Sequence, residues 1–206
     1  MSAQPEVFTG GLLETNACLF QTSDGLLVFD APAGLAQELN ILKQKVSLVI
    51  LTHGHFDHTW DAAVIARENR CPVFYHQADE ELCLNPEAAM RFVGMSGLVE
   101  PISATRFLKA GEILEYGDLR FQIFHIPGHS KGSLCFYEKN LGLLVGGDVL
   151  FAGGVGRWDL PGGSKEELIA GIRRDLFPLP DDTVVYPGHG PETTIGHEKR
   201  TNPYLQ

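Results

Sequence analysis

The densest group of residues that could bind a metal ion directly follows a short apolar run, 48–51. The next seven residues are Thr-His-Gly-His-Phe-Asp-His, and they include His53, His55, Asp57 and His58. Side chains alternate along a strand, so His53 and His55 can point the same way, and the other two can reach a second position in the following turn. Imidazole combined with carboxylate suits zinc, iron or manganese better than calcium, which prefers oxygen ligands. The stretch therefore predicts ligands for a transition metal where a strand ends.

Three further candidate ligands lie at other expected strand ends. His129 and His189 each complete a Pro-Gly-His triplet, and Asp148 follows two glycines. Proline stops a strand and glycine permits an unusual turn, so each histidine is delivered just past the strand. Two such endings, one in each half, predict two similar half-domains that meet at a shared site. All seven candidates together could bind two metal ions with one carboxylate shared between them.

The other three histidines lack this setting. His125 comes one residue before an Ile-Pro strand ending, where we expect it to pack or to form a hydrogen bond. His76 and His197 are expected to be solvated residues of a helix or loop. A lone histidine is more often an ordinary surface or core residue than a ligand, so the metal prediction depends on the grouping of the seven.

The elements that must position these residues are short strands mixed with helices. The expected strands span 16–21 and 26–30 (a hairpin around Ser23-Asp24-Gly25), 48–51, 73–75, several runs between 106 and 145 that include 119–126, and 183–186. The expected helices span 35–45, 60–68, 77–93 with an interruption near Pro86, and 164–176, which begins with a Ser164/Glu167 capping box.

Composition narrows the class of partner. The 206 residues suit one large domain, 1–206, which can fold without a structural metal or disulfide, so any metal should serve chemistry. The 16 Lys and Arg against 26 Asp and Glu give a net charge of −10. This balance argues against nucleic acid, whose binding requires clustered cations. We therefore expect a small-molecule partner, and the sequence indicates no oligomeric state.

The sequence also bears on the compartment. The first residues show no export signal, and no apolar stretch approaches the ~20 residues that span a bilayer. The four cysteines are scattered without a Cys-x-x-Cys pair; Cys18 and Cys135 lie in apolar runs typical of a core. These features favour a reducing cytoplasm and no membrane partner.

The motif Thr-His-x-His-x-Asp-His, followed by Pro-Gly-His, Gly-Gly-Asp and Pro-Gly-His, resembles that of the metallo-β-lactamase superfamily. The resemblance covers nearly the whole chain and implies an α/β fold, a four-layer αββα sandwich with the metals at one edge of two facing sheets. It implies two divalent metal ions, with zinc expected and iron or manganese also open. The implied ligands are His53, His55 and His129 for the first metal, Asp57, His58 and His189 for the second, and Asp148 as the bridge.

Residues 156–163, Gly-Arg-Trp-Asp-Leu-Pro-Gly-Gly, resemble a signature of compact glyoxalase II-like hydrolases, and the C-terminal residues are similar to theirs as well. This resemblance implies hydrolysis of thioesters of the hydroxyacylglutathione type, by attack of a metal-bridging hydroxide on the carbonyl. Two departures stand out. Trp158 replaces a usually small polar residue, and only a short segment follows His189, where full-length glyoxalase II enzymes carry a helical domain that contacts glutathione. Glutathione recognition therefore stays open.

Four of the candidate site residues could each have one of two roles. Asp57 could accept a proton from the attacking water, or act only as a ligand. Lys131 and Arg157 could meet a carboxylate of an anionic substrate; alternatively Lys131 is solvated, and for Arg157 we favour pairing with Asp159. Trp158 could form a wall of the pocket or fill the core.

Other functions fit parts of the pattern. A persulfide dioxygenase of the same superfamily would hold one iron with His53, His129 and Asp148. A lactonase would require the same chemistry from the metals as a thioesterase. A metal-holding module without turnover would have no need for an open dinuclear site. The charge disfavours a nuclease, and the lack of an export signal disfavours a β-lactamase proper.

Overall fold

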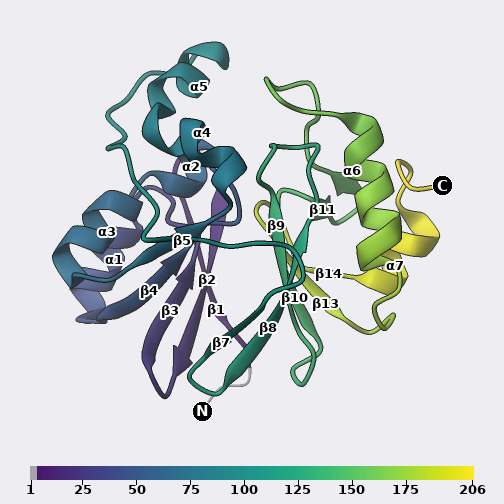
Figure 1. Cartoon of the computed structure of the whole chain (residues 1–206), viewed down its shortest axis with the longest axis horizontal. Coiled ribbons are helices and arrows are strands. Elements are labelled where there is room, and N and C mark those ends of the chain that lie inside the picture. The colour runs from purple at the N-terminus through teal and green to yellow at the C-terminus, as the bar shows by residue number, and fades with distance from the viewer. Residues whose placement is uncertain (1–3) are drawn as a thin grey trace.

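The computed structural model describes residues 4–206, so the first residues of the segment assessed above for an export signal lie outside it. Two six-stranded sheets face each other, and helices cover the outer side of each (Figure 1). The first sheet, in spatial order, consists of β1 (Glu6–Gly10), β2 (Thr15–Thr22), β3 (Gly25–Phe29), β4 (Val46–Ile50), β5 (Val73–Tyr75) and β6 (Arg106–Phe107).

The second sheet is built from the later part of the chain. Its spatial order is β14 (Thr193–Thr194), β13 (Val184–Pro187), β10 (Leu143–Gly147), β9 (Leu134–Glu138), β8 (Leu119–His125) and β7 (Ile113–Tyr116). A separate small hairpin pairs β11 (Leu150–Phe151) with β12 (Gly154–Val155). The helices are α1 (Leu35–Leu42), α2 (Phe56–Thr59), α3 (Ala62–Asn69), the 3₁₀ turn η1 (Gln77–Asp79), α4 (Glu80–Leu84), α5 (Pro86–Phe92), α6 (Lys165–Gly171), the π-helical η2 (Ile172–Leu176) and α7 (Ile195–Thr201). None of the helices in residues 4–206 has the length and apolar character needed to cross a bilayer.

Three apolar layers hold the four structural layers together. Leu48 and Ile50 of β4 point into the core between the two sheets, where Phe29 and Phe121 pack edge to face, and Val49 points to the outer side under α1 and α3. A third cluster lies between the second sheet and α6. β4 is buried on both faces because helices cover one face and a sheet the other, as its apolar run indicates. The αββα sandwich expected from the sequence is confirmed.

Most of the expected elements form, with shifted boundaries. The hairpin of β2 and β3 is antiparallel and turns between Thr22 and Gly25. The expected helix 60–68 is α3, which begins two residues later and follows the separate short helix α2. The 77–93 stretch breaks at Pro86, as expected, because proline at the first helical position of α5 cannot continue α4. Only half of the capping box forms: Ser164 Oγ accepts from Glu167 N, whereas Ser164 N donates to Gly128 O.

The expectation that the two Pro-Gly-His endings belong to separate half-domains is wrong. β8 precedes His129 and β13 precedes His189, and both strands lie in the second sheet. The first sheet contributes the loop after β4 instead. The pairing order of strands sets which sheet each ending joins, and a triplet repeated along the chain carries no information about that order.

A substitution in the layer between the sheets tests this core. Phe29 is 1% exposed and touches three other phenylalanine rings. We expect Phe29→Ala to lower the free energy of unfolding by about 3–5 kcal/mol, measured by urea denaturation at fixed metal content. Ile41→Ala, at a side chain of α1 that is 64% exposed, should change it by less than about 0.5 kcal/mol. A loss below about 1 kcal/mol for Phe29→Ala would contradict this packing.

Candidate metal centre

The loop that leaves β4 brings the first four candidates to the edge between the sheets. His55 stands immediately before α2, and Asp57 and His58 lie in the first turn of that helix. After the bend from strand to helix, the ligand atoms of Asp57 and His58 group with His189, whereas those of His53 and His55 group with His129. His53, His55 and His58 are buried, and Asp57 is partly exposed.

The seven sequence-predicted candidates converge on one place, although the metal-ligand assignments themselves stay predictions. Their nitrogen and oxygen atoms form three overlapping groups, in each of which all ligand atoms lie within 4.8 Å of one another. The groups are His53, His55 and His129; His53, His58 and Asp148; and Asp57, His58 and His189. The groups share His53 and His58, so the seven side chains form one continuous cluster.

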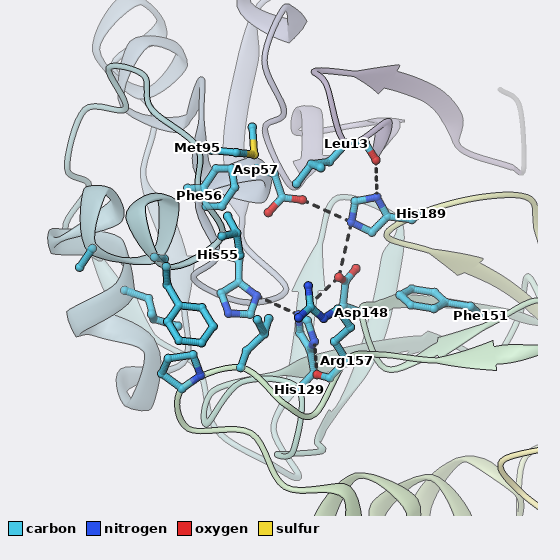
Figure 2. Close-up of a pocket in the computed structure, with 17 residues that line it drawn as sticks. Leu13, His55, Phe56, Asp57, Met95, His129, Asp148, Phe151, Arg157 and His189 are labelled. Carbon is cyan, nitrogen blue, oxygen red and sulfur yellow. Dashed lines mark hydrogen bonds and ion pairs between the residues drawn. The ribbon is translucent and has the colours of Figure 1, made fainter.

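Asp148 lies between the outer groups. Its Oδ1 is 3.3 Å from His58 Nε2, and its Oδ2 is 3.4 Å from both His129 Nε2 and His189 Nε2. Figure 2 shows the carboxylate between the two histidine rings, His129 below it and His189 above. On the other side, Asp57 Oδ2 lies 3.3 Å from His189 Nε2. One carboxylate therefore contacts imidazoles of both groups.

Unsatisfied polar atoms show that this cluster suits cations. Within the described chain, His58 Nε2 and Asp148 Oδ1 are buried side-chain atoms without a hydrogen-bond partner, although they face each other. His129 Nε2 lies 2.8 Å from His55 Nδ1 and 3.2 Å from His53 Nε2, three nitrogens that could all act as ligands to one ion. Leaving buried polar atoms unpaired costs free energy, which a bound divalent cation would offset. The residues fit a metal centre.

The glycines of the two Pro-Gly-His loops are required by close contacts. A Cβ at Gly188 would collide with Asp148 Oδ1 and would lie 2.7 Å from His58 Cε1. Gly128 has φ +132° and a Cβ there would collide with the backbone at the start of α6. Gly188 therefore keeps space for the ligand atoms, and Gly128 lets the His129 loop pack on α6.

The ring nitrogens turned away from the cluster are held by fixed acceptors. His58 Nδ1 lies 2.8 Å from Asp30 Oδ2, His129 Nδ1 2.8 Å from Arg157 O, and His189 Nδ1 2.9 Å from Leu13 O. Because a carboxylate and a carbonyl only accept hydrogen bonds, these contacts place a proton on Nδ1 and turn Nε2 toward the cluster. The arrangement is typical of metal-binding histidines, whose second nitrogen is oriented by an outer partner.

The charges of the cluster favour cations. Burial and the neighbouring His129 lower the pKa of His55 to about 3, so its imidazole is neutral. Burial alone would raise the pKa of Asp57, but His58 and His189 outweigh it and lower that pKa to about 2. Burial opposes a charge on His189 as well, yet Asp148 and Asp57 raise its pKa to about 10. Metal ligands must be deprotonated, so a cation bound beside His189 would displace a proton.

Two buried aspartates that the sequence analysis did not single out organise the cluster. Asp30, directly after β3, accepts hydrogen bonds from Thr52 N at 2.7 Å and Thr52 Oγ1 at 2.8 Å in addition to orienting His58. Its position directly after an apolar strand is the signal by which sequence analysis could have identified Asp30 as a site residue. Asp79 accepts from Gly54 N, Ser130 Oγ and Gly132 N, at 2.6 to 2.9 Å. Asp79 resembles an ordinary acid near a helix start, and nothing in its sequence context marks it.

The three candidate substrate residues occupy different surroundings. Arg157 lines the cavity at the cluster, but its guanidinium forms two hydrogen bonds with Asp159, as the alternative interpretation has it. Trp158 packs against the third core cluster, edge to face with Tyr204 at 5.7 Å. Lys131 is exposed and is absent from the residues that line the cavity. The roles of all three in substrate binding remain predictions.

The remaining histidines partly follow expectation. His125 Nε2 donates to Lys131 O at 2.8 Å, as a strand-end histidine should. His76 is partly buried rather than solvated, because its ring stacks on His125 at 4.0 Å. Burial and this neighbour lower the pKa of His76 to about 4. His197 lies in α7, away from the cluster.

Comparison with known proteins places this geometry in a family. The sequence pattern of the family described as "Metallo-beta-lactamase superfamily" matches residues 10–189. The chain belongs to this superfamily. Among its relatives, "Hydroxyacylglutathione hydrolase GloC" of Haemophilus influenzae is 38% identical over 173 residues, which are 83% of this chain and 81% of that one.

Two solved structures of the metallo-β-lactamase fold superpose closely. "TTHA1623 in a di-iron-bound form" has a TM-score of 0.88 and 36% identity, with 97% of this chain and 100% of that chain covered. "BLEG-1 B3 metallo-beta-lactamase" also has a TM-score of 0.88, with 34% identity and coverage of 97% and 98%. The superfamily and the clustered ligands indicate divalent metals, and the di-iron form of a similar protein leaves their identity open.

Removing Asp79 tests how the two metal-site loops are held. Asp79→Ala would leave the amides of Gly54 and Gly132 without their acceptor, so the His55 and His129 loops should loosen. We expect metal affinity to fall about 10–100-fold, measured by competition with a chromophoric chelator. Glu81→Ala, which removes an exposed carboxylate of α4, is the matched control and should bind metal as the unmodified protein does. Equal affinities for both variants would contradict the positioning role of Asp79.

Proposed function

We propose that the protein hydrolyses thioesters of the hydroxyacylglutathione type at a centre of two divalent metal ions. The observation that carries the proposal is the cluster of seven histidine and aspartate side chains, with two buried ligand atoms left unpaired. His53, His55 and His129 would hold the first ion, Asp57, His58 and His189 the second, and Asp148 would lie between them. This division follows the three overlapping groups of ligand atoms.

Bound divalent metals at this site would make water a nucleophile near neutral pH and would polarise a carbonyl. The chain's own residues orient the reaction. Asp30 and the carbonyls of Arg157 and Leu13 keep Nε2 of three histidines directed inward. Asp57, whose Oδ2 accepts a hydrogen bond from Thr15 Oγ1 at 2.8 Å, lines the cavity and is ionised. Asp57 could accept the proton that water loses, or serve only as a ligand.

The thioester class is supported by chemistry and by similarity. A thioester has a reactive carbonyl, and its thiolate leaves without much protonation, so the site needs no separate proton donor for the leaving group. The relative named hydroxyacylglutathione hydrolase shares 38% of the aligned residues. We propose zinc as the metal, since His and Asp ligands suit it, with iron and manganese as alternatives that availability decides. We also propose a cytoplasmic location, which the four free cysteines favour.

Elemental analysis followed by an activity assay tests the proposal. Protein purified without added metal should contain close to two divalent ions per chain and should hydrolyse S-lactoylglutathione, with loss of activity after chelation and recovery on adding metal. A β-lactam and a lactone serve as comparison substrates. Metal-loaded protein that cleaves neither S-lactoylglutathione nor a simple thioester would refute the proposed function.

Metal counts in two variants test the ligand assignment. His189→Ala should reduce the content from two ions to one, because it removes a ligand of the second site alone. Asp148→Ala should weaken both sites, because its carboxylate contacts histidines of both groups. Inductively coupled plasma mass spectrometry on folded protein gives the counts. Two ions per chain in His189→Ala would overturn the assignment.

The alternative of a mononuclear iron dioxygenase predicts different results. It would require one iron per chain and oxygen uptake with glutathione persulfide. The Asp57, His58 and His189 group would then have no role in metal binding, although its ligand atoms, like those of the first group, all lie within 4.8 Å of one another. An oxygen electrode and the same metal counts separate the two functions.

A further inference from the structure

The cavity beside the metal cluster is mostly apolar. It has a volume of about 630 Å³, within the range of pockets that hold small molecules. Five of its lining residues are His55, Asp57, His129, Asp148 and His189 of the cluster itself. Eleven of the seventeen lining residues are apolar. The same cavity therefore joins the reactive centre to an apolar wall.

The apolar wall comes mainly from one segment. Leu82 of α4, Ala89 and Phe92 of α5, and Val93 and Met95 just after it line the cavity, and Leu160 joins them from the loop before α6. Phe92 is 58% exposed and Val93 is 38% exposed, although both are large apolar residues. When an apolar ligand covers exposed apolar side chains of a cavity, apolar surface leaves water, and this favours binding. In Figure 1, α4 and α5 lie above the first sheet, and α6 lies on the outer side of the second sheet.

The cavity offers few partners for charged groups outside the cluster. Among its described lining residues, Arg157 is the one arginine or lysine, and Asp159 already pairs with it through two hydrogen bonds. A charged group placed against the apolar wall would therefore lose hydration without gaining a matching contact, which costs free energy. A substrate part without charge loses nothing comparable.

From these contacts we propose that the cavity holds an apolar acyl chain, so that the preferred substrates are thioesters of medium-chain acids. The inference rests on the proposed hydrolysis and specifies its substrate class. The thioester carbonyl would lie at the metal cluster, and the chain would extend along Leu82, Phe92 and Val93. Water adds to the carbonyl carbon and the carbon–sulfur bond breaks, which yields the carboxylic acid and the free thiol. No oxidant or further reactant is required.

A series of thioesters of one small neutral thiol tests the proposal. Acetyl, butanoyl, hexanoyl and octanoyl thioesters of N-acetylcysteamine differ only in apolar length. We expect kcat/KM of the metal-loaded protein to rise by up to about fourfold per added methylene until the chain fills the cavity. A profile that is flat or falls with length, in protein that hydrolyses the acetyl thioester, would overturn the proposal and leave the proposed hydrolysis standing.

A charge on the apolar wall provides the matched test. Phe92→Asp should lower the octanoyl-to-acetyl ratio of kcat/KM by about tenfold, because a carboxylate would lie against the chain. Ile41→Asp places the same charge on an exposed apolar position of α1, outside the cavity lining, and should keep the ratio of the unmodified protein. A ratio unchanged by Phe92→Asp would count against the assignment of this wall.

Direct binding separates failure of the substrate class from failure of the hydrolase function. If the metal-loaded protein cleaves no thioester, the proposed function is wrong, and the cavity is tested by calorimetric titration with octanoate and acetate. The two ligands share a carboxylate and differ in the chain. Octanoate should bind at least about tenfold more tightly than acetate, and Phe92→Asp should remove most of that difference. Equal affinities in the unmodified protein would refute an acyl-chain site.

Discussion

The structure depends on one electrostatic constraint, the gathering of buried imidazoles and carboxylates where two sheets end. His58 Nε2 and Asp148 Oδ1 face each other without a hydrogen-bond partner among the described residues, and ring nitrogens of His53 and His55 crowd around His129 Nε2. Such an arrangement is costly without a cation. Its neighbours hold it nonetheless: Asp30 orients His58 and the backbone carbonyls orient His129 and His189. The neighbouring groups therefore keep the candidate ligands in place even though unpaired buried polar atoms lower the stability of this region.

The two sheets have separate tasks in this arrangement. The first delivers the His53–His58 loop from a parallel strand, and the second delivers His129, Asp148 and His189 from three strand ends. Direct bonds join them: Asn16 Nδ2 donates to Pro187 O at 3.0 Å, and Leu134 N donates to Thr52 O at 2.8 Å. The packed phenylalanines between the sheets fix their separation. The ligand distances therefore depend on the whole sandwich and not on either sheet alone.

Membership of the metallo-β-lactamase superfamily accounts for the metal cluster but not for the substrate, because one fold carries many reactions. The substrate is selected by what surrounds the cluster. Here that surrounding is the apolar wall of α4 and α5, together with an arginine already paired to Asp159. The thioester with an apolar acyl chain that we propose would match both parts of the cavity, with its carbonyl at the metal cluster and its chain on the wall.

The sequence alone predicted the candidate ligands of the first loop, because spacing within a few residues of a strand end is a local property, and the structure brings these side chains together. It also predicted the sandwich and the strands that carry each histidine. Only the tertiary structure decided that both Pro-Gly-His loops share one sheet, that Asp79 connects the loops of His55 and His129, and that Trp158 packs, partly buried, against the third core cluster. These facts depend on contacts between segments far apart in the chain, and local residue patterns do not encode which distant surfaces meet.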